Sequence, residues 1–144
     1  MPTPDATVLE RRADIVEALR RIVPGEGVIV SHAERRAYES DGLTAYRQLP
    51  LVVVLPSNVE QVAAVLRYCK EFGVKVVPRG AGTSLSGGAL PLADGVLLGM
   101  AKFNRILEID YENRCAIVQP GVTNLAFFAE ASGCGESHRA EYSE

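Results

Sequence analysis

The sequence is poor in the residues from which disulfide frameworks, metal sites and membrane spans are built. It has no tryptophan and only three cysteines in 144 residues. The cysteines form no CxxC pair and have no metal-ligand spacing to either histidine; they are Cys69, Cys115 and Cys134. The longest strongly apolar segment, residues 49–55, is too short to cross a bilayer. Neither a disulfide framework, a metal site nor a transmembrane segment is therefore predicted.

Basic residues are also too few and too scattered to indicate a nucleic-acid partner. The 15 lysines and arginines are outnumbered by 18 acidic residues, which gives a net charge of −3. The first 20 residues carry charges where a signal peptide needs an apolar run. What is present, 47% hydrophobic and 23% charged residues, is ordinary for a globular protein with a real core. The sequence predicts a cytoplasmic protein.

A buried strand, an amphipathic helix and a second strand are predicted in the middle of the chain. Residues 51–55 (LVVVL) form a continuous apolar run, which is typical of a strand covered on both faces. Ser57 and Glu60 have the spacing of a capping box at the start of a helix, and Gly73 fits the position after its end. The apolar face expected for this helix carries Val59, Val62, Ala63, Leu66 and Cys69. A strand over residues 74–78 follows, so the order indicates a βαβ crossover.

The flanking sequence predicts further elements. Before the crossover we expect a helix over residues 7–23, a strand over 28–30 and a polar, irregular stretch over 32–46. After it we expect strands over residues 95–100, 106–110 and 115–119, the last two joined as a hairpin by the polar turn 110–114. Thr123 is expected to cap a helix that runs through Ser132.

A glycine-rich loop, residues 78–91 (PRGAGTSLSGGALP), follows the second strand of the crossover. Glycine allows close approach of a ligand, and successive amides in such a loop can converge on an anion, most often a phosphate. Gly88 stands where a P-loop needs lysine, and Leu85 stands where a dinucleotide fingerprint needs its third glycine, so neither motif is present. Composition alone leaves two readings open, an anion-binding loop and a crossover loop without a ligand.

The loop belongs to a series of four segments, VVVLPSNVEQVAAVLRYC, VPRGAGTSLSGGALP, GVLLGMAKFNRILEID and AIVQPGVTNL. In this order they resemble the FAD-linked oxidases of the vanillyl-alcohol oxidase/PCMH superfamily, and within it the glycolate oxidase D subunits and D-lactate dehydrogenases. The resemblance covers residues 36–126. It implies an α+β fold, a PCMH-type FAD-binding domain whose first subdomain contains the βαβ unit and the start of a second sheet.

The resemblance further implies that FAD is the cofactor, with its pyrophosphate wrapped by the loop amides and a second segment near the isoalloxazine ring. The residues assigned to FAD on this ground are Arg79, Gly80, Ala81, Gly82, Thr83, Ser84, Ser86, Gly87, Gly88, Pro120, Gly121 and Val122. For Arg79 a second reading stands beside this one, in which the guanidinium caps the end of the strand through local carbonyls.

Three regions are expected: an N-terminal helix and extension over residues 1–47, the N-terminal part of the FAD-binding domain over 48–126, and an atypical tail over 127–144, in which disorder is one reading. Members of the resembled family are several-fold longer. They continue with a second flavin-binding stretch and a cap domain that carries the substrate-binding and catalytic residues. The chain is therefore expected to be a truncated, N-terminal fragment.

The function that the resemblance implies is that of the FAD-binding portion of a flavin-dependent 2-hydroxy-acid dehydrogenase, which oxidises glycolate or D-lactate by hydride transfer to FAD. The implied partners are the other subunits of a glycolate oxidase complex, an FAD-binding companion and an iron–sulfur subunit, through which the protein would lie at the inner face of the membrane. Without the cap domain the chain alone is expected to be inactive. The alternative is a truncated remnant or an interaction module that binds no FAD.

No residue is assigned a catalytic role or a metal. The titratable candidates are read as structural or solvated; they are His32, His138, Asp41, Asp94, Asp110, Tyr38, Tyr46 and Tyr68. The three aspartates are expected in solvated turns, and nothing in the spacing of serine, histidine and aspartate indicates a catalytic triad.

Overall fold

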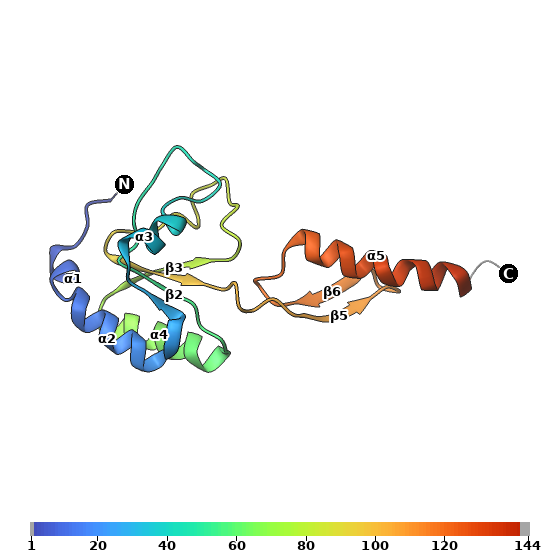
Figure 1. Cartoon of the computed structure of the whole chain (residues 1–144), viewed down its shortest axis with the longest axis horizontal. Coiled ribbons are helices and arrows are strands. Elements are labelled where there is room, and N and C mark those ends of the chain that lie inside the picture. Colours follow the sequence, from blue (N-terminus) through green and yellow to red (C-terminus); the bar gives the residue numbers. More distant parts are fainter. Residues whose placement is uncertain (1, 142–144) are drawn as a thin grey trace. The chain divides into compact units, whose positions relative to one another are not determined.

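The computed structural model describes the backbone of residues 2–141 and the side chains of residues 2–132. Cys134 and His138 thus have side chains outside the described part. The chain forms two compact units, Met1–Lys102 and Phe103–Glu144 (Figure 1). No helix in the described range is long and apolar enough to cross a membrane.

The first unit is built on a four-stranded sheet in the order β1-β2-β4-β3. The strands are β1 (Val28–Ile29), β2 (Val52–Val54), β3 (Lys75–Arg79) and β4 (Gly95–Gly99). β2, β4 and β3 run parallel, whereas β1 pairs antiparallel with β2. The predicted strand–helix–strand unit is confirmed, with β4 lying between its two strands. This leaves the carboxyl ends of three parallel strands at one edge of the sheet, where open α/β sheets place their ligands.

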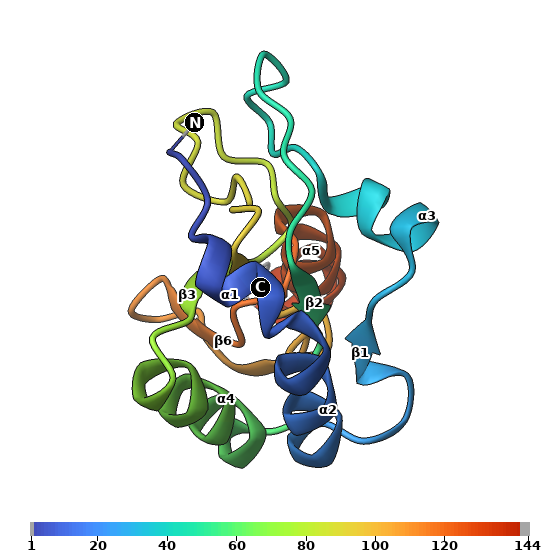
Figure 2. The same ribbon diagram turned by 90° about the vertical axis from the view of Figure 1, so that its left-hand side faces the viewer.

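Helices cover the two faces of this sheet differently (Figures 1 and 2). On one face lie α1 (Ala6–Glu10), α2 (Arg12–Ile22) and α4 (Val59–Glu71), whose buried side chains form the main core with the alternate strand residues Val52, Val54, Val96 and Leu98. The other face carries a smaller cluster around Val53, Val77 and Leu97. It is covered by the segment that follows α3 (His32–Arg35) and contains the short helix η2 (Arg36–Tyr38).

Two details of the helices differ from the predictions, the extent of the first helix and the cap of α4. The single helix expected over residues 7–23 is two, because Arg11 leaves the helical conformation and donates to the carbonyls of Thr7 and Phe72. The cap of α4 is Asn58, whose side chain accepts from the Gln61 amide, and the Gln61 side chain accepts from the Ser57 amide in return. The Ser57–Glu60 capping box is therefore displaced by one residue.

The C-terminal end of α4 follows the prediction, whereas the buried apolar face of the helix is narrower than predicted. Gly73 has a φ of +66° and the Val74 amide donates to the Cys69 carbonyl, which is a Schellman ending. Two residues expected on the buried face are largely exposed, Val59 at 68% and Leu66 at 45%. Because a helix of this length buries only a stripe against a sheet, side chains at the margin of the stripe remain in solvent.

The second unit consists of a hairpin and a helix. β5 (Ile106–Asp110) and β6 (Cys115–Val118) pair antiparallel, as predicted, and α5 (Asn124–Glu141) follows. The turn is closed by Asp110, whose carboxylate accepts from the amide and the side chain of Asn113. Thr123 caps the helix through the Ala126 amide, as predicted, and the helix continues beyond Ser132.

Two aspartates that we expected in solvated turns are buried instead, Asp41 at 5% and Asp94 at 2% exposure. Asp94 accepts hydrogen bonds from the Asp5 amide and from Lys75 Nζ, at 2.8 and 2.7 Å. Burial acts to raise the pKa of Asp94, but these donors outweigh it and hold the pKa below the ordinary value of 3.8. The carboxylate ties the N-terminus to the start of β4.

This ion pair makes the first unit sensitive to acid. Because the pKa of folded Asp94 is lowered, its contribution to stability is complete above the ordinary value of 3.8 and is lost as the pH falls through the folded-state value. We expect Asp94→Asn to lower the free energy of unfolding by about 1–2 kcal/mol at pH 7 and to flatten its decline below about pH 4. Urea unfolding at a series of pH values measures the free energy of unfolding at pH 7 and its decline toward acid. An equal decline with pH in the two proteins would contradict the prediction.

Candidate functional site

The glycine-rich loop leaves the sheet at the carboxyl end of β3. It follows Arg79 and returns to the start of β4, and Figure 2 shows it rising from the sheet in yellow-green. In the part of the chain that the structure describes, the main-chain amides of residues 80–85 donate no hydrogen bond. Because an amide without a partner is a ready donor, a run of them in an exposed loop is suited to an anion with several oxygens.

Two glycines of the loop have conformations that other residues adopt with strain. Gly82 and Gly87 each have a φ of +74°. A Cβ at Gly82 would also lie 2.3–2.4 Å from the guanidinium atoms of Arg79. At Gly87 the space is open, with Leu43 Cδ2 at 3.9 Å as the nearest atom. Glycine is required at these positions by backbone conformation and, at Gly82, by close packing.

Between Gly80 and Gly88 the side chains of the loop are small, with Leu85 as the one exception. The Ser84 hydroxyl accepts from the Ser86 amide at 3.3 Å, which shapes the middle of the loop and leaves its own proton free to donate. Leu85, between these two serines, is 75% exposed. The loop therefore combines main-chain amides and hydroxyls around one protruding apolar side chain.

Arg79 is engaged by the segment before the crossover. Its Nη1 donates to the carbonyls of Ser40 and Tyr38, at 2.7 and 3.4 Å, and its guanidinium lies 5.7 Å from the centre of the Tyr38 ring. The guanidinium thus meets carbonyls, as in the second reading of Arg79, but these carbonyls lie far away in the sequence and are not the local ones expected. A contact with FAD stays a prediction.

The second segment assigned to FAD lies in the other unit. Gly121 and Val122 are half-buried, and their amides donate to the carbonyls of Phe103 and Gln119 at 2.7 and 3.1 Å. Pro120 is exposed. The amides of this segment are thus used within the unit, unlike those of the glycine-rich loop, and its role toward the flavin also stays a prediction.

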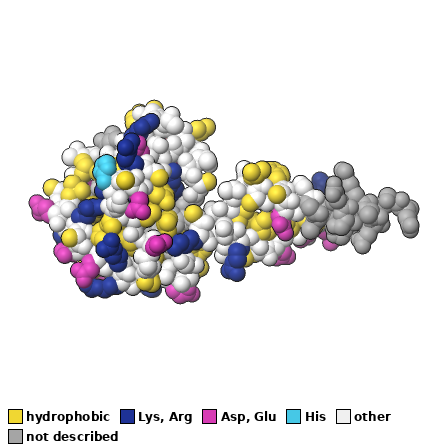
Figure 3. Space-filling model, viewed as in Figure 1, with side chains coloured by type: hydrophobic (Ala, Val, Ile, Leu, Met, Phe, Trp, Pro, Cys, Tyr) yellow, Lys and Arg dark blue, Asp and Glu magenta, His cyan; other side chains and the backbone are white. Residues whose placement is uncertain are grey.

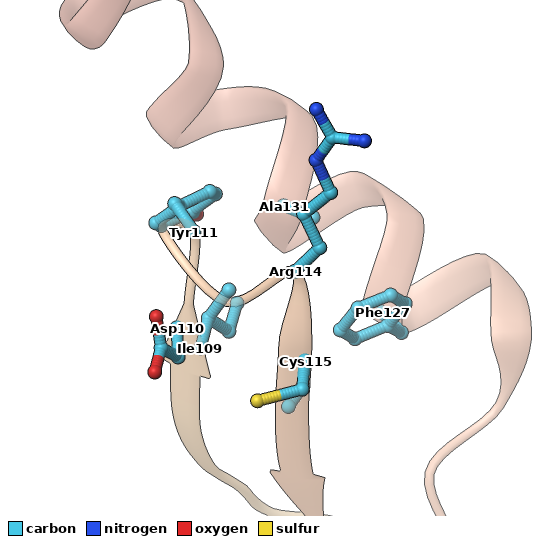
Figure 4. A pocket seen from close by; sticks show the side chains of 8 residues that line it. Ile109, Asp110, Tyr111, Arg114, Cys115, Phe127 and Ala131 are labelled. Carbon is cyan, nitrogen blue, oxygen red and sulfur yellow. The ribbon is translucent and has the colours of Figure 1, made fainter.

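A pocket of about 270 Å³ lies between the hairpin and α5, and sequence reasoning did not find it (Figure 4). It is largely apolar, with Ile109 and Ala116 from the hairpin and Phe127 and Ala131 from the helix on its walls. A second apolar hollow of about 280 Å³ lies along the same helix, where Val118, Val122 and Phe127 meet. No sequence motif marks either, because each arises from the packing of a helix on a hairpin.

The side chains considered for catalysis are either engaged in structural contacts or stand apart from other functional groups. His32 is exposed on α3, and no group of three or more metal-ligating side chains occurs in the described residues. The Cys69 thiol is buried against α2 and the sheet, which raises its pKa to about 11, so it stays protonated at neutral pH. Tyr68 stacks on Phe72 with ring centres 4.6 Å apart.

Comparison with known proteins places this geometry in a family. Residues 50–135 match the model of a family described as an FAD binding domain. The chain is 56% identical over 115 residues to the glycolate oxidase subunit GlcD of Escherichia coli K12, which covers 80% of this chain and 23% of that protein. It is 35% identical over 123 residues to a D-lactate dehydrogenase of Anaerostipes hadrus, covering 83% and 26%.

A comparison with solved structures leads to the same group of proteins. A solved structure of p-cresol methylhydroxylase with substrate bound superimposes with a TM-score of 0.75 at 25% identity, over 92% of this chain and 26% of that chain. The expected PCMH-type fold and the resemblance to glycolate oxidase D subunits and D-lactate dehydrogenases are confirmed. The chain spans about a quarter of the length of the relatives it matches.

Proposed function

The chain belongs to the FAD binding domain family, and we propose that its glycine-rich loop holds the pyrophosphate of FAD. The observation that carries this is the run of amides in residues 80–85, at the carboxyl edge of the sheet, that have no hydrogen-bond partner among the described residues. A pyrophosphate offers many acceptor oxygens and needs close approach of backbone, which the glycines permit. No lysine is required for such a contact, which fits the Gly88 position.

The loop residues act through their main chains, with hydroxyls in support. Gly80, Ala81, Gly82 and Thr83 present amides to the phosphates, and Ser84, Ser86, Gly87 and Gly88 lie close by. Arg79 adds positive charge at the foot of the loop. Pro120, Gly121 and Val122 form a second approach, toward the ring system of the flavin. FAD itself supplies the hydride-accepting centre, and the chain's residues bind and orient it.

The protein to which this domain belongs would oxidise a 2-hydroxy acid, either glycolate or D-lactate. The relatives with these names support that substrate class. Electrons would leave through partner subunits, an FAD-binding companion and an iron–sulfur subunit, which would hold the protein at the inner face of the membrane. The substrate-binding and catalytic residues belong to the part of the relatives that this chain does not span.

Leu85 offers a charge series that tests the phosphate site without altering the fold, because it is 75% exposed. Relative to Leu85→Gln, we expect Leu85→Glu to raise the dissociation constant for FAD about three- to ten-fold and Leu85→Lys to lower it by a similar factor. Both effects should shrink at high salt, since exposed charges are screened. Titration followed by flavin fluorescence measures the constants, and three equal values would contradict a phosphate at this loop.

A second candidate is an interaction module that binds no FAD. The second unit exposes apolar side chains, which favours a partner surface (Figure 3). The most exposed of them are Leu107 at 56%, Ile117 at 55%, Leu125 at 81% and Phe128 at 62%. The two candidates differ in one observable. FAD raises the melting temperature if the folded chain binds it and leaves it unchanged otherwise.

A further inference from the structure

The glycine-rich loop rests on a segment that precedes the loop by about 40 positions, residues 38–43 (YESDGL), here called the strap. The strap lies before residues 50–135, the range that the family model matches. Figure 2 shows the strap's continuation in teal beside the yellow-green loop. The two segments touch at three places, at the foot, the middle and the far end of the loop.

At the far end, one buried carboxylate joins strap and loop. Asp41 is 5% exposed; its Oδ1 accepts from the Leu43 amide at 3.0 Å, and its Oδ2 accepts from the Ala89 amide at 3.4 Å. The first bond closes the turn of the strap on itself, and the second fixes the residue at which the loop turns back toward β4. A buried carboxylate with acceptors on both sides is suited to tie two backbones that have no ladder between them.

In the middle, backbone lies directly on backbone. A Cβ placed on Gly42 would lie 2.7 Å from the Thr83 carbonyl oxygen and 2.9 Å from that of Ser84. Neither oxygen can swing aside as a side chain can, so only glycine permits this approach. The contact turns both carbonyls toward the strap.

At the foot of the loop, Arg79 completes the contact. Its Nη1 reaches the carbonyls of Tyr38 and Ser40, and its guanidinium fills the space where Gly82 has no Cβ. The first residue of the strap and the first turn of the loop are thus held by one side chain.

We propose that the strap is a positioning element for the loop, with Asp41 as its central residue, and that it sets the conformation in which the loop amides face an anion. The proposal rests on the proposed function of the loop. The amides of residues 80–85 have no hydrogen-bond partner among the described residues, so no hydrogen bond from these amides fixes their orientation. A glycine-rich loop has much conformational freedom to lose on binding, and contacts that order it beforehand lower that cost.

Asp41→Asn tests this with nearly unchanged shape. An asparagine can accept from one of the two amides, but its NH₂ then faces the other amide, donor against donor. If the binding-competent loop falls to about a tenth of the population, the dissociation constant for FAD rises about ten-fold. The matched control is Asp94→Asn, a second buried aspartate of the same unit that accepts from one amide and one side chain at the opposite ends of the strands. We expect both variants to lower the melting temperature and only Asp41→Asn to weaken the binding of FAD.

A second readout needs no FAD. Amide ¹⁵N relaxation of the free 144-residue chain should give order parameters of about 0.85 for the loop in the unaltered protein and in Asp94→Asn, and below about 0.6 in Asp41→Asn. An ordered loop in Asp41→Asn, or equal loss of FAD affinity in both variants, overturns the role of the strap. If the unaltered chain fails to bind FAD, the proposed function of the loop fails, and the relaxation data still decide whether the strap orders it.

Discussion

The 144-residue chain is expected to bind FAD and yet to leave glycolate and D-lactate unoxidised. Oxidation of a 2-hydroxy acid needs a positioned flavin and, beside it, a base or charge clamp at the substrate carbon. Enzymes of this kind accelerate reactions by about a million-fold or more, so loss of the catalytic groups brings turnover to background. The expected effect is a complete loss of activity in a protein that still binds its cofactor.

The described residues support this expectation because four of the candidates for a catalytic role already have structural ones. Asp41 and Asp94 are buried and joined to backbone amides. Tyr38 packs under the Arg79 guanidinium, and Tyr68 stacks on Phe72. None of these side chains is both exposed and unengaged, as a group that meets a substrate must be.

The measurement is reduction of an artificial electron acceptor by the FAD-loaded chain with each hydroxy acid. A full-length relative assayed in the same way serves as the positive control, and bound flavin is confirmed by fluorescence in the same sample. Saturable turnover by the chain alone would overturn the expectation and would place a substrate site within these residues.

The local parts of the fold could be predicted from the sequence. The apolar run at residues 51–55, the helix that follows and the position of Gly73 each depend on neighbours a few residues away, and the structure confirms them. The glycine-rich loop could also be placed, because it follows directly from the end of a strand. Capping was predictable in kind and wrong by one residue, since the cap is Asn58, which accepts from the Gln61 amide, while the Gln61 side chain accepts from the Ser57 amide.

The partners of the loop could not be predicted, because they join residues far apart in the sequence. Asp41 and Asp94 have the surroundings of turn residues, and turn residues are usually solvated. Their burial is decided by the Ala89 amide in one case and by Lys75 and the Asp5 amide in the other. The residues next to an aspartate do not predict which distant amide will donate a hydrogen bond to it. The strap can therefore be recognised only in the folded chain.

Leu97→Ala is expected to cost the first unit much of its stability. Leu97 lies in the central strand β4, is fully buried, and packs with Val53 and Val77 on the face of the sheet that the strap covers. Removing its side chain leaves a cavity on that face of the sheet, which costs about 3 kcal/mol and lowers the melting temperature by roughly 10–20 °C. Leu66→Ala is the matched control, because Leu66 is 45% exposed on α4 and should change stability by less than about 0.5 kcal/mol.

The same variant links the cofactor to the fold. A ligand that binds only the folded chain stabilises it by about 2.7 kcal/mol at one hundred times its dissociation constant, which nearly offsets the loss of Leu97. Calorimetry of Leu97→Ala with and without FAD should therefore show the melting temperature return most of the way to that of the unaltered chain. Inorganic pyrophosphate tested alongside separates the loop's share of this stabilisation from the flavin's. If FAD leaves the melting temperature of both proteins unchanged, the folded first unit does not bind FAD, and the interaction module is favoured.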